Sequence, residues 1–401
     1  MIRESAVRSQ ICILGGGFGG LYTALRLAQF PWSSPPEITL VDHSDRFVFT
    51  PLLYELITGE LEAWEIAPPF VELLRDTPVV FHQGAVTTID LQEKTVHLGK
   101  GDPFTYEKLV LALGGETPKS TIPGVAADAL TFRTLSDAYR LEEALQRCEH
   151  SDRDRIRVVV VGAGPSGVEL ACKLAERLGS RGRIRLVDRN PEILKSSPEF
   201  NRKAALRALE DRGVWIDLET TPVALTRDRI SLQYKDRVDE LPVDIVLWTV
   251  GTAVSPVIAA LDLPKTASGR LQVTPTLQVV DHPDIFALGD AADAVDEQGQ
   301  PIPHTAQAAF QQADYVAWNL WASLSDRPLL PCRYSHLGEM LTLGRDRAAL
   351  AGLGLTLDGP LAYLARRLAY LYRMPTLEHQ LKVGLNWIAK PFLDLLTTIA
   401  S

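Results

Sequence analysis

The sequence has few cysteines, and the four that it has include no C-x-x-C pair. Thiols this sparse exclude a disulfide framework, and without such a pair neither a zinc ribbon nor a vicinal dithiol can form. No uninterrupted run of about 18 apolar residues is present, so no membrane-spanning helix is expected. The first nine residues hold no apolar stretch, which predicts neither a signal peptide nor a transit peptide.

Basic residues are also fewer than acidic ones. Lys and Arg number 41 against 50 Asp and Glu, which gives a net charge of -9. An acidic chain repels a phosphate backbone, so nucleic acid is not an expected partner. With 46% hydrophobic and 23% charged residues the chain can bury sizeable cores. A single core usually stops growing at about 250 to 300 residues, so the length predicts two or three units.

One pattern occurs twice: an apolar strand, a glycine-rich turn and an amphipathic helix, followed by a strand that ends in aspartate. The first copy consists of strand 10–14, Gly15, Gly17, Gly20, strand 38–41 and Asp42, and the second of strand 157–161, Gly162, Gly164, Gly167, strand 184–187 and Asp188. One such turn is a weak indicator, because ordinary glycine-rich turns share it. Two copies in the same context predict an α/β protein with two Rossmann-like dinucleotide-binding folds.

The chemistry of a dinucleotide explains this spacing. The first glycine makes the tight turn, the second lets a pyrophosphate approach the backbone, and the third lets helix and strand pack closely. The phosphates then lie on free amides at the helix N-terminus, and the aspartate accepts hydrogen bonds from the ribose hydroxyls. Both aspartates of the sequence are placed for this role.

The remaining apolar segments predict the domain boundaries. Strands are expected at 87–98 and 105–113 in the first unit, at 216–225, 229–234 and 245–250 in the second, and at 283–290, which returns to the first. The first domain is therefore expected to be discontinuous. The expected boundaries are 1–117 and 274–330 for the first domain, 118–273 for the second, and 331–401 for a C-terminal region.

Residues 359–401 combine basic charge with a helical spacing of apolar side chains. Basic residues outnumber acidic ones in this tail, whereas the whole chain is acidic. Apolar side chains recur every three or four residues in two runs, first at Leu361, Leu364, Leu368 and Leu371, and after Pro375 at Leu381, Leu385, Ile388, Phe392, Leu395 and Ile399. We expect amphipathic helices that lie on a membrane surface, with packing on the protein's own core or in a homodimer interface as the alternatives.

Two further stretches resemble a family of flavoproteins. They are 109–114 (LVLALG) and 287–290 (ALGD), which together with the glycine turns are similar to the flavoproteins with two dinucleotide-binding domains. In that family the first fold holds FAD and the second holds NADH or NADPH. The resemblance implies that Gly15, Gly17, Gly20 and Asp42 hold the FAD, and that Gly162, Gly164, Gly167 and Asp188 hold the nicotinamide dinucleotide.

Three more stretches, 49–54, 248–251 and 306–312, resemble type II NADH:quinone oxidoreductases and extend the likeness over nearly the whole chain. Residues 52–56 and 371–375 are most similar to the cyanobacterial and plastid branch. That branch includes the demethylphylloquinone reductases of vitamin K1 synthesis. The resemblance implies a lipid-soluble quinone as the electron acceptor.

The same resemblance implies further cofactor contacts. Asp290 would accept a hydrogen bond from the ribityl chain of the flavin, although its position also suits a helix N-cap. Thr50 and Pro51 would lie near the isoalloxazine, although 51–53 is equally typical of a buried turn. Gly251, in the matched stretch 248–251, would be a further cofactor-binding residue.

The residues expected to contact the electron donor and acceptor also have more than one interpretation. Asp188 would repel the 2′-phosphate of NADPH and so favours NADH, whereas the neighbouring Arg189 can pair with that phosphate. Glu169 matches a glutamate that the family places close to nicotinamide and flavin; otherwise it is a first-turn acid that suits the helix dipole. Gln307 and Gln311 share one helical face and would donate hydrogen bonds to a quinone carbonyl, with a solvated face as the alternative.

These features predict an FAD-dependent enzyme that transfers two electrons from NADH or NADPH to a membrane quinone without pumping protons. It would be peripheral, on the cytoplasmic side of a membrane in a cyanobacterial-type prokaryote, with demethylphylloquinone, another naphthoquinone or plastoquinone as acceptor. The eight histidines show no ligand spacing, so no metal site is expected. One alternative is a sulfide:quinone oxidoreductase, with Cys148 and Cys332 as the reactive pair. The other is a redox sensor that responds to NADH by changing its partners.

Overall fold

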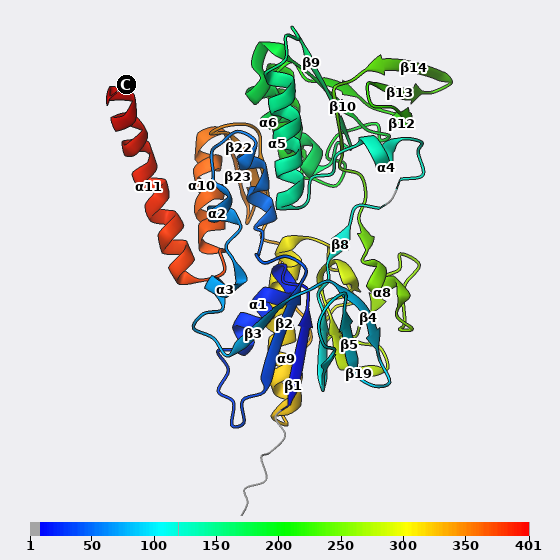
Figure 1. The fold of residues 1–401 in the computed structure, drawn as a ribbon, viewed down its shortest axis with the longest axis vertical. Coiled ribbons are helices and arrows are strands. Elements are labelled where there is room, and N and C mark those ends of the chain that lie inside the picture. The colour runs from blue at the N-terminus through cyan, green and yellow to red at the C-terminus, as the bar shows by residue number, and fades with distance from the viewer. Residues whose placement is uncertain (1–8, 119, 401) are drawn as a thin grey trace, which may run out of the picture. The chain divides into compact units, whose positions relative to one another are not determined.

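The computed structural model describes residues 9–118 and 120–400, and for 391–400 the backbone alone. The chain forms two compact units (Figure 1). Unit 1 comprises residues 9–47, 68–116 and 252–335, and unit 2 comprises 48–67, 117–251 and 336–400. Each unit therefore draws on three separate segments of the sequence.

The two units differ from the predicted domains in three places. The C-terminal region expected at 331–401 is not a separate unit, because 331–335 belong to unit 1 and 336–400 to unit 2. Residues 48–67, expected with the first domain, belong to unit 2, where the Glu55 side chain forms a buried ion pair. Residues 252–273, expected with the second domain, belong to unit 1, where β16 (Ala253–Val254) pairs antiparallel with β8 (Gly115–Glu116). Which cofactor each unit holds stays a prediction from the sequence.

A six-stranded sheet forms the centre of unit 1. Its strands, in spatial order, are β18 (Gln278–Val279), β19 (His282–Ala287), β7 (Lys108–Leu111), β1 (Gln10–Leu14), β2 (Glu37–Asp42) and β3 (Val79–Gln83). All pairs are parallel except β18 with β19. The apolar run of β1 is buried, as expected for a parallel sheet that is covered on both faces. The predicted strands at 10–14 and 38–41 and the return of 283–290 to this sheet are confirmed.

Two helices pack together in unit 1, α1 (Phe18–Leu27) and α9 (Ala306–Leu324) (Figure 1). The Tyr22 and Phe310 rings meet with their centroids 4.6 Å apart, and Arg26 Nε donates a hydrogen bond to Asp314 Oδ1 at 2.7 Å. The buried leucines of α1 face β1 and β2. Aromatic and leucine packing therefore fixes the helix that follows the first glycine turn.

The segment predicted as one strand at 87–98 is a hairpin. Asp90 Oδ1 accepts hydrogen bonds from the backbone N–H groups of Gln92 and Glu93, both at 2.9 Å, and Lys94 has a φ of 48°. This side-chain turn reverses the chain where no glycine or proline marks it. The smaller elements of unit 1 are β4 (Val86–Asp90), β5 (Thr95–Leu98), β6 (Phe104–Thr105), α3 (Phe70–Leu73), α8 (Pro256–Ala260), β17 (Leu271–Gln272), η3 (Gly289–Ala291) and β20 (Ala292–Asp293).

A four-stranded parallel sheet forms the centre of unit 2. Its strands, in spatial order, are β11 (Trp215–Asp217), β10 (Gly182–Val187), β9 (Ile156–Val161) and β15 (Ile245–Trp248). Its helices are α4 (Val125–Asp128), α5 (Leu135–Glu149), α6 (Pro165–Leu178), η2 (Gly179–Arg181) and α7 (Glu199–Asp211). The recurrence of a parallel sheet with a glycine turn and helix confirms the predicted α/β class with two Rossmann-like folds.

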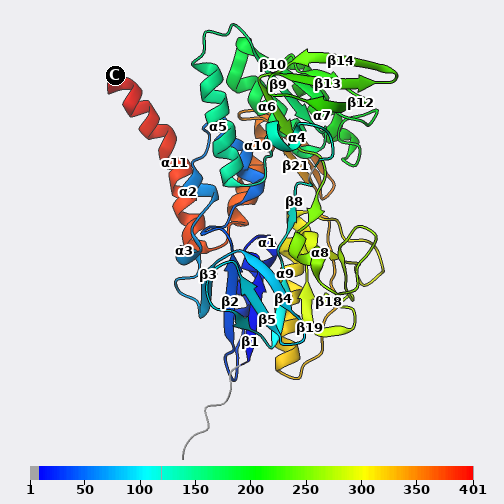
Figure 2. The ribbon, with the colours of Figure 1, turned by 45° about the vertical axis from the view of Figure 1, so that its right-hand side comes forward.

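A second, antiparallel sheet of unit 2 consists of β12 (Thr220–Leu225), β13 (Arg229–Tyr234) and β14 (Arg237–Pro242) (Figure 2). The strand predicted at 216–225 is divided between the two sheets. Glu219 lies at the division with a φ of 52°, in the left-handed region, so the extended chain ends there. The first part, β11, stays in the parallel sheet.

The C-terminal part of unit 2 is a small sheet followed by two helices. Its elements are β21 (Glu339–Thr342), β22 (Ala348–Gly352), β23 (Leu355–Asp358), α10 (Gly359–Tyr372) and α11 (Leu377–Ala400), together with η1 (Thr50–Leu56) and α2 (Ala63–Ile66) of the same unit. The two helices confirm the predicted helical tail. The side chains of Leu395 and Ile399 lie outside the described residues. Within residues 9–118 and 120–400, no helix combines the length and apolarity that crossing a bilayer requires.

Candidate functional site

The first glycine turn lies between β1 and α1 of unit 1. Gly15 has a φ of +99°, in the region that favours glycine, and a Cβ at Gly20 would collide with the carbonyl oxygen of Gly15. A Cβ at Gly17 would meet nothing within 4 Å. That open space beside the backbone is where a pyrophosphate approaches such a turn. The three positions therefore have the geometry that a bound dinucleotide requires.

Asp42 ends β2, and its carboxylate reaches the first glycine turn. Its Oδ2 accepts a hydrogen bond from the backbone N–H of Gly16 at 2.6 Å, and its Oδ1 accepts one from the backbone N–H of Ser44 at 2.8 Å. The hydrogen bond between His43 and Asp42 raises the pKa of the His43 imidazole. The carboxylate is thus held at the carboxyl edge of the sheet, where a dinucleotide ribose lies in this kind of fold.

The second glycine turn repeats this arrangement in unit 2. Gly162 has a φ of +107°, a Cβ at Gly167 would collide with the carbonyl oxygen of Gly162, and a Cβ at Gly164 would meet nothing within 4 Å. Asp188 Oδ2 accepts a hydrogen bond from the backbone N–H of Ala163 at 2.6 Å. The same local sequence therefore builds the same cradle twice.

The residues after Asp188 bear on the choice of electron donor. Asn190 donates hydrogen bonds to Asp188 Oδ1 from its backbone N–H at 2.7 Å and from its side-chain Nδ2 at 2.8 Å. Arg189 is exposed. The aspartate that would repel a 2′-phosphate is thus fixed in place, and the arginine that can bind this phosphate is accessible.

Gly251 follows β15, near the second glycine turn. The Thr249 hydroxyl donates a hydrogen bond to the carbonyl oxygen of Val161 at 2.8 Å, directly before Gly162. Gly251 has a φ of +82°, a conformation that favours glycine. It therefore lies at the same edge of the sheet as the second turn.

Asp290 lies in η3 of unit 1, directly after β19. The N-cap of η3 is Leu288, so the N-cap alternative for Asp290 is wrong. A Cβ at Gly115 would lie 2.8 Å from Asp290 Oδ2, which places the carboxylate beside the first residue of β8. Sequence reasoning missed Gln312, a buried residue of α9 whose Oε1 accepts a hydrogen bond from the backbone N–H of Gly289 at 2.8 Å. Its place within the matched stretch 306–312 was the available signal.

Thr50 and Pro51 begin η1 of unit 2. Thr50 is exposed and Pro51 is half-buried, whereas Leu52 and Leu53 are buried. The carbonyl oxygen of Pro51 accepts a hydrogen bond from Arg366 at 2.6 Å. The buried-turn interpretation thus holds for the leucines, and the flavin contact of Thr50 and Pro51 stays a prediction.

Glu169 is a buried acid of α6 and only 6% exposed. Its Oε1 accepts a hydrogen bond from the backbone N–H of Thr342 at 2.8 Å. Burial raises the pKa of this carboxyl to about 8, against the opposing effect of nearby Arg366. Glu169 lies beyond the first turn of α6, so the alternative of a first-turn acid is wrong. A carboxyl with this pKa can exchange a proton near neutral pH.

Gln307 and Gln311 lie on one face of α9, as predicted, and both bond to the same short segment of unit 1. Gln307 Oε1 accepts a hydrogen bond from the Tyr334 hydroxyl at 3.0 Å. The Gln311 amide both donates to the carbonyl oxygen of Ser335 and accepts from its backbone N–H, each at 2.9 Å. The two amides are therefore held in place rather than freely solvated, and their contact with a quinone stays a prediction.

Buried charges in unit 2 are the main feature that sequence reasoning missed. Arg366 and Lys173 are both 0% exposed, and they form ion pairs with Glu55 and Glu60 respectively. Charged groups are almost never buried unless they are paired. One signal was available: Arg366 lies among the regularly spaced leucines of the tail.

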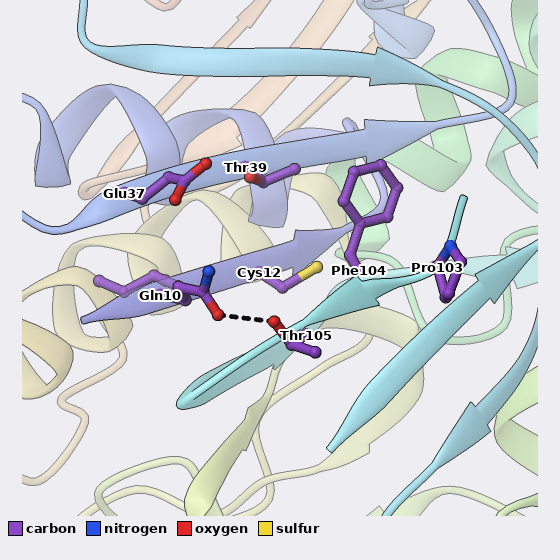
Figure 3. A pocket seen from close by; sticks show the side chains of 8 residues that line it. Gln10, Cys12, Glu37, Thr39, Pro103, Phe104 and Thr105 are labelled. Carbon is purple, nitrogen blue, oxygen red and sulfur yellow. Dashed lines mark hydrogen bonds between the residues drawn. The ribbon is translucent and has the colours of Figure 1, made fainter. Parts of the chain in front are cut away.

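A cavity of about 180 Å³ lies at the end of the unit 1 sheet opposite to the first glycine turn (Figure 3). Its lining includes Gln10 and Glu37, which begin β1 and β2, and Phe104. Thr105 Oγ1 donates a hydrogen bond to Gln10 Oε1 at 2.8 Å (Figure 3). Dinucleotides bind at the carboxyl ends of such strands, so this cavity is not part of the candidate FAD site.

Comparisons with known proteins agree with this geometry. The family model of the pyridine nucleotide-disulphide oxidoreductases matches residues 9–313. Demethylphylloquinone reductase NdbB of Synechocystis sp. is 56% identical over 395 residues, which cover 97% of this chain and 98% of that protein. Alternative NAD(P)H-ubiquinone oxidoreductase C1 of Arabidopsis thaliana is 43% identical over 433 residues, which cover 98% of this chain and 83% of that protein.

A solved structure shares the fold. NDH2 of Plasmodium falciparum in complex with NADH matches with a TM-score of 0.85 at 17% identity, over 96% of this chain and 98% of that chain. Other relatives are named type II NADH:quinone oxidoreductases. The chain belongs to the pyridine nucleotide-disulphide oxidoreductase family, among its type II NAD(P)H:quinone oxidoreductases.

Proposed function

We propose that this protein is an FAD-dependent NAD(P)H:quinone oxidoreductase. The observation that carries the proposal is the duplicated cradle: a glycine turn with an open middle position and an aspartate that bonds to the turn, once in each unit. One enzyme that moves electrons between two nucleotide cofactors needs two such sites. Relatives that match nearly the whole chain are named as quinone reductases.

The chain's own groups bind and orient the two nucleotides. FAD, when bound, supplies the two-electron chemistry between NAD(P)H and the quinone. Gly17 and Asp42 would hold its pyrophosphate and ribose, and Gly164 and Asp188 would hold those of the nicotinamide nucleotide. In the overall reaction NAD(P)H, one proton and the quinone give NAD(P)+ and the quinol.

For the acceptor we propose a naphthoquinone of the demethylphylloquinone type. The support is the 56% identity to a demethylphylloquinone reductase over almost the full length of both chains. Gln307 and Gln311 are the proposed carbonyl donors, because each amide is held on one face of α9 by a bond to the 334–335 segment. A held amide loses little conformational freedom when it binds a ligand.

Exposed apolar side chains on α10 and α11 supply a surface for a lipid-soluble acceptor. Eight residues of these helices, here called the leucine stripe, are each more than half exposed: Leu361, Leu364, Leu368, Tyr372, Leu377, Leu381, Leu385 and Ile388. The opposite face of α10 is buried. Packing of the stripe on the protein's own core, one of the two alternatives, is therefore wrong for these residues. We propose that the stripe lies in the surface of a lipid bilayer.

Cations and aromatic rings accompany the leucine stripe, which suits a headgroup region. The Arg367 guanidinium lies 4.1 Å from the centre of the Trp387 ring, and Lys382 Nζ lies 5.3 Å from that of Trp64. The Trp387 indole N–H donates a hydrogen bond to Glu65 at 2.8 Å and so ties α11 to α2. The peripheral, membrane-bound location rests on these contacts, with a homodimer interface as the competing use of the stripe.

The cysteines disfavour the sulfide:quinone alternative. That reaction needs a nucleophilic thiolate, and burial raises the pKa of the Cys332 thiol to about 12. Cys332 is 0% exposed. A buried thiol with this pKa is protonated at neutral pH and reacts slowly, so Cys148 would lack its predicted partner.

The test is steady-state oxidation of NADH and NADPH by the purified flavoprotein with a short-chain naphthoquinone, a benzoquinone or oxygen as acceptor. We expect naphthoquinone turnover at least about tenfold faster than turnover with oxygen. Turnover no faster than air oxidation would instead support the redox-sensor interpretation. The double change Cys148→Ser and Cys332→Ser is expected to leave quinone turnover unchanged, and its loss with FAD retained would favour the sulfide enzyme.

A further inference from the structure

The buried core of unit 2 contains three carboxylates and two cations whose pairing is uneven. Glu55 pairs with Arg366, and Glu60 pairs with Lys173. Glu169 makes no salt bridge within the described residues, although Lys173 lies four residues away, on the same face of α6. Both cations in reach of Glu169 are thus committed to other carboxylates.

The Glu55 pair is held by several contacts. Arg366 also donates a hydrogen bond to the carbonyl oxygen of Pro51 at 2.6 Å, and its guanidinium lies 4.8 Å from the centre of the Tyr370 ring. Glu55 is 1% exposed. The contacts hold the guanidinium against η1, where the negative charge of Glu55 offsets part of the attraction between Arg366 and a second carboxylate.

The Glu60 pair is held in a similar way. Glu60 Oε1 accepts a hydrogen bond from the Tyr363 hydroxyl at 3.1 Å, and its Oε2 bonds to Thr58 as well as to Lys173. The backbone N–H of Glu60 donates to the carbonyl oxygen of Glu55 at 3.0 Å. The two paired carboxylates therefore sit on one continuous stretch of chain.

We propose that Glu55 and Glu60 are positioning residues: each holds a cation in an ion pair of its own, so that Glu169 remains a neutral buried acid able to give a proton. This inference rests on the proposed function. Reduction of a quinone to a quinol takes up two electrons and two protons. The hydride from NAD(P)H accounts for both electrons and one proton, so the second proton comes from water through a protein group.

The charged and titratable groups around Glu169 come from four elements. They are Tyr54 and Glu55 of η1, Cys172 and Lys173 of α6, and Arg366 and Tyr370 of α10, with the backbone N–H of Thr342 of β21 as hydrogen-bond donor. Burial is the largest influence and raises the pKa of Glu169. Arg366 and Lys173 lower that pKa, whereas Glu55 raises it.

These opposing influences predict shifts of opposite sign. Glu55→Gln keeps the shape of the side chain but removes its charge, so Arg366 acts on Glu169 alone and the Glu169 pKa falls. Arg366→Met leaves Glu55 as an unpaired neighbour, so the Glu169 pKa rises. The double variant removes both charges, and because Arg366 acts on Glu169 more strongly than Glu55 does, its Glu169 pKa rises by less than in Arg366→Met. Glu60→Gln lowers the pKa through the release of Lys173.

The experiment is an infrared titration of the FAD-loaded protein, with the neutral carboxyl stretch of Glu169 identified as the band lost in Glu169→Gln. We expect the midpoint to fall by about one pH unit in Glu55→Gln and to rise by a similar amount in Arg366→Met. Glu142→Gln is the matched control, because it breaks an ion pair of Arg177 on the same helix and leaves the midpoint unchanged.

Two results would overturn the inference: shifts of the same sign in Glu55→Gln and Arg366→Met, or no shift in either. If Glu55→Gln or Arg366→Met fails to fold, the midpoints of Glu60→Gln and of the double variant test the inference instead. The double variant is expected to fold, because removing both members of a buried ion pair costs less stability than leaving one charge unpaired. A midpoint that falls in Glu60→Gln and rises in the double variant supports the inference, and an unchanged midpoint in both overturns it. The titration needs no turnover, so an inactive enzyme would contradict the proposed function and leave this result standing.

Discussion

The two glycine turns are nearly identical, but the helices that follow them differ. In both turns the middle glycine faces open space and the aspartate bonds to the residue after the first glycine. Two residues beyond the last glycine, the first copy has Tyr22, which packs on Phe310, and the second has the buried acid Glu169. This helix position is therefore used for aromatic packing in the first copy and for a buried titratable group in the second.

The next corresponding pair extends this contrast. Six residues beyond the last glycine, the first copy has Arg26, nearly half exposed in an ion pair with Asp314, and the second has the fully buried Lys173. An exposed ion pair contributes about 0 to 1 kcal/mol to stability, whereas a buried one strongly constrains its surroundings. Under the proposals above, the same motif would serve binding alone in unit 1 and binding together with proton chemistry in unit 2.

The largest effect is expected from the last glycine of each turn. Gly20→Ala adds a Cβ that collides with the carbonyl oxygen of Gly15, and Gly167→Ala does the same at Gly162. Gly20→Ala should lower the FAD content at least about tenfold, whereas Gly167→Ala should keep FAD but slow flavin bleaching by NAD(P)H at least about a hundredfold. Absorbance of the purified proteins and anaerobic mixing measure both. Loss of FAD from Gly167→Ala alone would reverse the assignment of the two turns.

The second effect is a pH dependence of stability that comes from the buried acid of unit 2. The pKa of Glu169 is raised from 4.5 to about 8, so its contribution to stability is complete below pH 4.5 and is lost as pH rises through 8. The wild type should lose about 3 kcal/mol more of its unfolding free energy between pH 5 and pH 8 than Glu169→Gln. Urea titrations at fixed FAD concentration measure this difference.

Glu142 supplies the control for the pH experiment, because the hydrogen bond to Arg177 lowers the pKa of its carboxyl. Its contribution is present above the ordinary pKa and is lost as pH falls. Glu142→Gln should therefore lower stability by a constant amount from pH 5 to pH 8, and its difference from the wild type should shrink only at more acid pH. Parallel curves for the wild type and Glu169→Gln from pH 5 to pH 8 would contradict the buried neutral acid.

A smaller effect tests the two aspartates. Asp188→Ser removes the carboxylate that would repel a 2′-phosphate, and the accessible Arg189 remains, so the ratio of kcat/KM for NADPH to that for NADH should rise about tenfold. Asp42→Ser is the matched change in the other turn, and it should weaken FAD retention without altering that ratio. A changed ratio in Asp42→Ser would show that the turns are not specialised.

The smallest effect concerns the leucine stripe of unit 2. Leu364→Gln combined with Leu381→Gln removes two exposed side chains of the leucine stripe, and the double variant should bind anionic lipid vesicles roughly fivefold more weakly. Val238→Gln is the control, because Val238 and Leu364 are each 54% exposed and Val238 lies on β14. Sedimentation with vesicles measures the binding. Unchanged vesicle binding together with a dimer that dissociates in the double variant would assign the stripe to a homodimer interface.

The sequence predicted the features that depend on neighbouring residues. Both glycine turns, their strands and the two tail helices follow from local spacing, and each lies where it was expected. The hairpin at 86–98 was predicted as one strand because its turn, 91–94, contains neither glycine nor proline. The Asp90 side chain makes that turn instead, and its capping hydrogen bonds cannot be told from composition alone.

The buried pairs of unit 2 could not be predicted from local spacing. Glu55 and Arg366 are 311 residues apart, and only the packing of η1 against α10 brings them together. Residues 48–67 accordingly belong to unit 2, although the glycine turn that precedes them in sequence belongs to unit 1. Burial of Glu169 likewise depends on β21, which contributes the backbone N–H of Thr342.

A double-mixing stopped-flow experiment on the flavin absorbance of the purified protein, without oxygen, tests directly whether electrons pass from a nicotinamide nucleotide through the flavin to a quinone. The first mix adds NADH or NADPH, and the second adds a naphthoquinone. We expect rapid bleaching by one of the two nucleotides and rapid recovery of the oxidised flavin by the quinone, with bleaching abolished in Gly167→Ala. Failure of both nucleotides to bleach the flavin, or equal bleaching in Gly167→Ala, would contradict this expectation.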